Sequence, residues 1–122
     1  MSLSLATFLD KLQNEPQSIT FDNTMAIIQQ YYHIKPCAFR NGDIENKAGE
    51  NKGSCQLLAF AQRHDLSESQ TLACFGDYYR KEVLGDLLGN SHQNIRQFMK
   101  YGWDGVEFSD QVLREKAALQ DQ

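Results

Sequence analysis

The sequence lacks the long apolar run and the excess of positive charge that would place it in a membrane or on nucleic acid. Its longest apolar run, Leu57–Ala61, is far shorter than the ~20 residues that a membrane-spanning helix needs. The formal net charge is −4 and the isoelectric point is about 5.3, so no basic surface for nucleic acid or anionic lipid is expected. We therefore expect neither a membrane nor a nucleic-acid partner.

Cysteine is scarce, and its spacing excludes common structural uses. Cys37, Cys55 and Cys74 form an odd set without a CxxC pair or a zinc-finger arrangement of histidines. We expect no metal site and no cofactor. Free thiols fit a reducing compartment, and the first residues lack the features of a secretory signal peptide. The expected location is the cytoplasm of the producing cell.

Several catalytic signatures are also missing: a P-loop, the glycine pattern of dinucleotide-binding folds, and paired carboxylates. What the 122 residues do contain is a globular composition, with 41% hydrophobic and 23% charged residues. No repeat, low-complexity run or linker divides the chain. At this length we expect a single domain over residues 1–122.

Helical periodicity covers most of the chain. The apolar spacing over 5–12 predicts an amphipathic helix that Pro16 ends. Ile19–Phe21 is a short β-prone stretch, after which Asp22 is expected to cap a second helix. The segment Cys55–His64 is apolar almost all round, which predicts the central buried helix.

A capping-box pattern at Ser67 and Gln70 predicts a further helix, whose buried stripe continues as far as Val83. Gly76 lies within that stripe, and a close helix contact would explain a glycine there. We expect a leucine at this position to cost ~1–3 kcal/mol through overpacking. The core is predicted to contain Leu58, Phe60, Leu72, Phe75, Ile95 and Phe98.

Two more helices are predicted near the C-terminus. Ser91 is expected to cap a helix that ends at Gly102, with Ile95, Phe98 and Met99 facing inward. Ser109 is expected to cap a last helix over about 109–122 with a frayed end.

The segment between His33 and Gly53 has no helical periodicity. An Asn-Gly turn signal at Asn41 predicts a hairpin there, which Val106–Phe108 would extend as a third strand. The predicted fold class is α+β and mostly helical, with about five or six helices and a small sheet of two or three short strands.

Cys55 is the candidate nucleophile. A cysteine in the first turn of a helix faces unpaired backbone amides and the positive end of the helix dipole, which favour the thiolate and can receive an oxyanion. A buried cysteine that only fills space is the competing interpretation. His92 also lies at a helix start, where a neutral ring can accept a proton, so it is the candidate base.

Two clusters of amides and glycines each precede a capped helix. We expect the loop 41–53 to pack near the segment 91–96 and to form the main polar concavity of the protein. The candidate binding residues are Asn41, Asn51, Ser54, Asn94, Arg96 and Trp103.

Five segments in matching order resemble the HopJ type III effector family over about residues 5–108. They are Phe39–Gly42, Ala48–Cys55, Thr71–Arg80, His92–Arg96 and Gly102–Gly105. The resemblance implies a HopJ-like domain and export through a type III secretion system into a host cell. It brings no catalytic residues with it.

Three functions remain open on the sequence. The leading hypothesis is a monomeric binding or effector module, without enzymatic activity, for a protein or small-molecule partner. The second is a small cysteine-dependent enzyme for acyl or thiol transfer, with Cys55 as nucleophile and His92 as base. The third is a housekeeping protein that binds a small ligand in a pocket framed by the loop 41–53.

Overall fold

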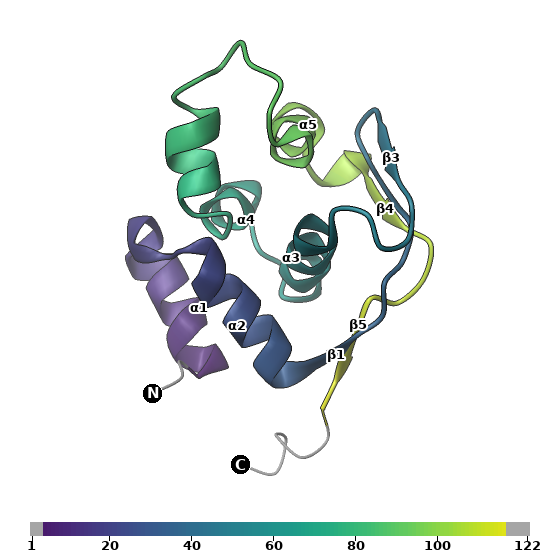
Figure 1. Ribbon diagram of the computed structural model, residues 1–122. Coiled ribbons are helices and arrows are strands. Elements are labelled where there is room, and N and C mark those ends of the chain that lie inside the picture. The colour runs from purple at the N-terminus through teal and green to yellow at the C-terminus, as the bar shows by residue number, and fades with distance from the viewer. Residues whose placement is uncertain (1–3, 117–122) are drawn as a thin grey trace.

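Two helices with side-chain caps begin the fold in this computed structural model, which describes residues 4–116. Ser4 caps α1 (Leu5–Asn14), whose buried face is formed by the predicted apolar stripe. Thr20 caps α2 (Phe21–Tyr31) in a capping box with Asn23, in which each side chain accepts a hydrogen bond from the other residue's backbone amide. The two helices lie side by side in Figure 1.

The predicted strand at Ile19–Phe21 is wrong, and so is the choice of Asp22 as the cap. A single-turn 3-10 helix, η1 (Pro16–Ser18), leads directly to the Thr20 cap. The Thr20 hydroxyl can satisfy a first-turn amide because it precedes the helix, whereas Asp22 lies inside the first turn. Local capping chemistry therefore overrides the β propensity of this stretch.

The predicted central buried helix is confirmed as α3 (Lys52–Arg63). It lies in the middle of the molecule, with α2 on one side and α5 on the other (Figure 1). Four of its side chains have no exposed surface: Leu57, Leu58, Phe60 and Ala61. Burying such side chains is the main favourable contribution to folding.

The predicted capping box of Ser67 and Gln70 is confirmed at the start of α4 (Glu68–Ala73). The helix does not continue as far as predicted, because Gly76 adopts the left-handed backbone conformation with φ +62°. The chain then forms η2 (Tyr78–Val83), a π-helix with a new direction.

Gly76 lies against the start of α2, as its predicted close contact requires. A Cβ atom added to Gly76 would lie 2.6 Å from the backbone nitrogen of Phe21. The Thr24 hydroxyl donates a buried hydrogen bond of 2.9 Å to the carbonyl of Cys74. The break between α4 and η2 is therefore held against α2 at Cys74 and at the glycine itself.

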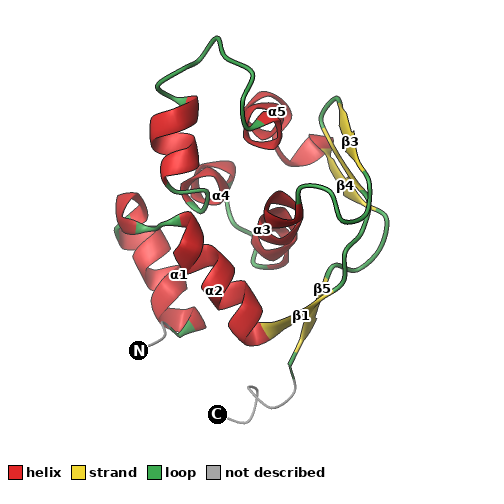
Figure 2. Cartoon of the chain, in the orientation of Figure 1, coloured by secondary structure: helices red, strands yellow, loops and turns green. Residues whose placement is uncertain are grey.

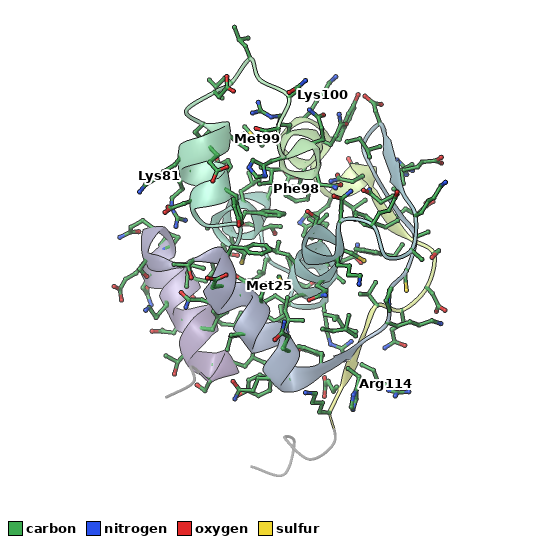
Figure 3. All side chains as sticks on the ribbon, viewed as in Figure 1. Met25, Lys81, Phe98, Met99, Lys100 and Arg114 are labelled. Carbon is green, nitrogen blue, oxygen red and sulfur yellow. The ribbon has the colours of Figure 1, made fainter. Side chains whose placement is uncertain are left out.

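The helix α5 (Gln93–Tyr101) is amphipathic, and Ile95 and Phe98 are buried as predicted. Figure 3 shows Phe98 directed into the molecule and Lys100 directed away from it. Met99 is 40% exposed, so its predicted inward position is wrong. It lies on the side of α5 that faces η2 (Figure 3).

The predicted three-stranded sheet is confirmed. β2 (Phe39–Asn41) forms a hairpin with β3 (Ile44–Asn46), and the turn between them contains Gly42 at φ +61°. β4 (Val106–Phe108) pairs with the other edge of β2, after the 3-10 helix η3 (Gly102–Gly105) has connected it to α5. All pairs are antiparallel, and Figure 2 shows the strands grouped beside the helical body.

The helix predicted from Ser109 is wrong within the described residues. β5 (Leu113–Glu115) instead pairs antiparallel with β1 (Tyr32–Ile34), directly after α2. The pairing satisfies backbone amides and carbonyls that β1 would otherwise leave free, and two further backbone hydrogen bonds extend the ladder beyond the strands. The predicted frayed end at 117–122 lies outside the described residues.

One hydrophobic core connects the helices with both sheets. Five of the six predicted core residues are buried, and Leu72 is partly buried against them. No helix within residues 4–116 is long and apolar enough to cross a membrane. The fold class is α+β and mostly helical, as predicted.

Candidate functional site

A cavity of about 350 Å³ lies where the start of α3 meets the start of α5. The two segments predicted to form a polar concavity, 41–53 and 91–96, both contribute to it. Its polar wall contains Asn51, Ser54, His92, Gln93 and Asn94. The structure therefore brings together three of the candidate binding residues and the candidate base.

Both helix starts present backbone donors to this cavity. α3 follows Asn51 and α5 follows His92, and each of these residues has a left-handed backbone with φ 50°. No side chain of the described residues caps either helix, so Ser91 is not the cap that was predicted. The amides of the first turns, such as those of Ser54 and Gln93, have no partner within their helices. They can donate to a ligand, and the helix dipoles favour a negatively charged one.

Four asparagines hold the hairpin against α5. Asn41 Nδ2 donates to the carbonyl and to Oδ1 of Asn94, at 2.8 and 3.0 Å. Asn94 and Asn46 exchange hydrogen bonds of 3.2 and 3.3 Å, and Asn51 Nδ2 donates to Asn46 Oδ1 at 2.6 Å. Three of the four side chains are buried, where hydrogen bonds between amides are strong and an unpaired amide is costly. The network fixes the polar wall of the cavity.

Aromatic rings also line the cavity. Phe21 stacks on Phe75 with ring centroids 6.4 Å apart, and Tyr78 meets Phe21 edge-on at 5.2 Å. Tyr78 also contacts the ring of His92, with centroids 5.1 Å apart. These rings come from α2, from the break after α4 and from η2, so the turn at Gly76 sets their positions.

His92 has a carboxylate partner. Its Nε2 atom lies 2.7 Å from Oε1 of Glu82, a residue of η2. The contact joins the start of α5 to η2. A ring held by Glu82 and Tyr78 is oriented, which suits a group that binds a ligand or moves a proton.

The Cys55 thiol lies elsewhere. It is only 4% exposed, and its sulfur lies 3.8 Å from the carbonyl oxygen of Cys37. Both cysteines line a second, smaller cavity of about 220 Å³, to which His92 does not contribute. Burial raises the pKa of the Cys55 thiol above its ordinary value, so it is protonated at neutral pH. Residues 4–116 hold no group of three or more His, Cys, Asp or Glu side chains that could bind a metal ion.

We expect the Cys55 thiol to react slowly with iodoacetamide in a variant with Cys37→Ser and Cys74→Ser. Its burial and its raised pKa both lower the concentration of accessible thiolate, so the alkylation rate should follow the rate of unfolding. The matched control carries Ser54→Cys and Cys55→Ser on the same background, since Ser54 is half-buried and lines the open cavity. Equal, fast alkylation of both variants would contradict this expectation.

Three candidate binding residues, Asn41, Arg96 and Trp103, do not line the cavity. Asn41 supports its polar wall through the hydrogen bonds to Asn94. The Arg96 guanidinium donates to the backbone carbonyls of Asp86 and Ser91, at 2.9 and 2.5 Å, and so holds the loop before α5. Trp103 Nε1 donates to the carbonyl of Leu66 at 3.0 Å, and its ring packs on the core. The side chains of Arg96 and Trp103 support the fold around the site.

Sequence reasoning missed several residues of the site. The sequence pattern placed Phe21 in a short strand. The capping residue Thr20 is the signal that would have placed Phe21 at the start of a helix, where it lies beside the cavity. Asn46 and Glu82 carry no local signal, because their partners lie on distant segments.

Comparisons with known proteins give a family and a related structure. A family model described as HopJ type III effector protein matches residues 5–113, nearly the whole chain. A solved structure, described as the crystal structure of unknown function protein VPA0580, is similar with 46% sequence identity and a TM-score of 0.93. That similarity covers 95% of this chain and 97% of the other. None of the curated proteins matches the chain.

Proposed function

The chain belongs to the HopJ type III effector family, and we propose that within it the protein is a binding module rather than an enzyme. Its site is the cavity between the starts of α3 and α5. The observation that carries the proposal is the meeting of two uncapped helix starts with a wall of aromatic rings in one open cavity.

These two walls suggest the class of ligand. Phe21, Phe75 and Tyr78 offer apolar ring surface for a flat, apolar group. The first-turn amides of α3 and α5 suit an acceptor with negative charge, such as a carboxylate. We propose a small ligand that combines a flat, apolar group with a negatively charged acceptor.

The cysteine-enzyme alternative has less support. Cys55 and His92 line different cavities, and each has another polar partner. A nucleophilic thiol needs an adjacent base or a lowered pKa, and the pKa of Cys55 moves the other way. This arrangement favours the binding module.

The family also bears on where the protein works. We propose that it is made in the cytoplasm of the producing cell and exported as a monomer through a type III secretion system, in keeping with the family's description. Its proposed partner is a protein or small molecule, without nucleic acid or membrane. The housekeeping alternative would use the same cavity inside the producing cell, so an export assay separates the two.

Benzoate is a suitable probe for the cavity, with neutral benzamide as its matched control. In a titration followed by amide NMR, we expect saturable shifts at Ser54, Gln93 and Asn94, with a Kd for benzoate on the order of 1 mM. Benzamide should bind about 5-fold more weakly, because two helix dipoles favour the negative charge.

The variant Tyr78→Ala should lose benzoate binding, because it removes part of the aromatic wall. Tyr101→Ala is the matched control, since Tyr101 is similarly exposed but does not line the cavity. Unsaturable shifts, or shifts centred on another surface, would refute the proposed site.

A further inference from the structure

His92 is a residue of the cavity wall and is also the partner of a carboxylate. Its Nε2 atom lies 2.7 Å from Oε1 of Glu82, and its ring lies beside that of Tyr78, which also lines the cavity. The His92 side chain is 29% exposed, so solvent reaches the ring in the folded protein. A proton can therefore bind to His92 or leave it without unfolding of the chain.

Histidine is the side chain that ordinarily changes its charge between about pH 5 and 8. Carboxylates, phenols and guanidinium groups ordinarily titrate outside that range. The groups of these kinds near His92 are Glu82 and Tyr78 of η2 and Arg96, one turn further along α5. The wall side chains that residues 44–54 contribute are uncharged: Ile44, Asn51 and Ser54. The charge of the cavity wall therefore changes with pH through His92.

The two charge states of His92 differ in what they offer to an anionic ligand. The protonated ring forms an ion pair with Glu82 and adds one positive charge to the wall, next to the first-turn amides of α5. The neutral ring adds no charge and leaves the Glu82 carboxylate without a compensating cation at this contact. Loss of the proton removes an attraction and adds a repulsion, so both changes weaken the binding of a carboxylate as the pH rises.

We propose that His92, held by Glu82, makes the cavity a pH-dependent site that binds a carboxylate ligand more tightly in mild acid than above neutral pH. The inference rests on the proposed function, because it concerns the same cavity and the same class of ligand. A neutral ligand of the same shape should not respond to pH, since its interaction with the wall does not depend on the charge of His92. Solvent and salt screen the effect, which we expect to be about 5-fold in Kd.

The test measures the Kd of benzoate by amide NMR between pH 5.5 and pH 7.5 at low ionic strength, where benzoate remains ionised. We expect the Kd to rise about 5-fold over this range, as His92 loses its proton. Benzamide is the matched neutral control, and its Kd should stay constant. Added salt should reduce the pH dependence for benzoate.

Two variants assign the pH dependence to the pair. His92→Asn removes the titrating ring, and asparagine tolerates the left-handed backbone at φ 50°, so benzoate affinity should no longer depend on pH. Glu82→Gln keeps the ring but removes the carboxylate that favours its protonated form. It should tighten benzoate binding at pH 7.5 and move the fall in affinity to lower pH. His33→Asn is the matched control, since His33 is an exposed histidine of β1 that does not line the cavity.

The outcomes separate this inference from the proposed function. Saturable benzoate binding in the cavity with the same Kd at every pH would overturn the inference and leave the proposed function standing. A pH dependence that His92→Asn leaves unchanged, or a pH profile that Glu82→Gln does not move, would also overturn it. The absence of saturable benzoate binding at every pH would instead refute the proposed function, and the inference with it.

Discussion

Replacing Gly76 with alanine is expected to lower the free energy of unfolding by about 2–5 kcal/mol. The left-handed backbone at φ +62° costs about 1–2 kcal/mol for a residue with a side chain. The added Cβ would also lie 2.6 Å from the Phe21 nitrogen, and overpacking costs about 1–3 kcal/mol. The obstructing atom is backbone, which cannot turn aside as a side chain can. The melting temperature should fall by roughly 10 °C or more, measured by circular dichroism.

Gly49→Ala is the matched control, because Gly49 also has a positive φ, of +90°, but has no neighbouring atom within 4 Å of the added Cβ. It should lose only the ~1–2 kcal/mol of backbone strain. Any effect of alanine on the unfolded chain is common to both variants. Equal losses in the two would show that the contact between Gly76 and Phe21 does not constrain the fold.

Asn94→Ala is expected to cost about 2–4 kcal/mol of stability, although its side chain is neutral and small. The change removes its three hydrogen bonds with the amides of Asn41 and Asn46 and leaves buried polar groups with fewer partners. Urea unfolding should show a lower midpoint. Benzoate affinity should fall as well, because the polar wall of the cavity loses its support.

A double-mutant cycle tests whether the asparagines act as one network. Asn46→Ala combined with Asn94→Ala should cost less than the sum of the single changes, by about 1 kcal/mol or more. Gln93→Ala, at an exposed neighbouring position, should change stability by less than about 0.5 kcal/mol. Strict additivity of the two asparagine variants would mean that each amide acts alone.

Local signals in the sequence predicted several of the elements that surround the cavity. The capping box at Ser67 and the turn beside Asn41 each act over a few residues, and both are present as expected. The amide-rich segments 41–53 and 91–96 were expected to meet, and they form the polar wall of one cavity. The capping box and the turn depend on hydrogen bonds between near neighbours, whereas the two amide-rich segments are joined by hydrogen bonds of Asn41 and Asn46 with Asn94, far along the chain.

Tertiary contacts decided the features that local patterns could not predict. The apolar stripe running to Val83 looks continuous, yet the helix breaks at Gly76, whose left-handed backbone packs directly against the start of α2. Leu113 lies in a strand because its backbone pairs with β1, whose amides and carbonyls would otherwise lack partners.

The sequence by itself determined the fold class, the central helix, the hairpin and membership of the family. The tertiary structure alone decided that Cys55 is buried, that His92 meets Glu82 and that the leucines after η2 remain exposed. The physical reason is the separation along the chain over which each interaction acts. Capping, turn geometry and periodicity act between residues close in sequence. Burial and the choice of a polar partner depend on which distant segments the folded chain brings against each side chain.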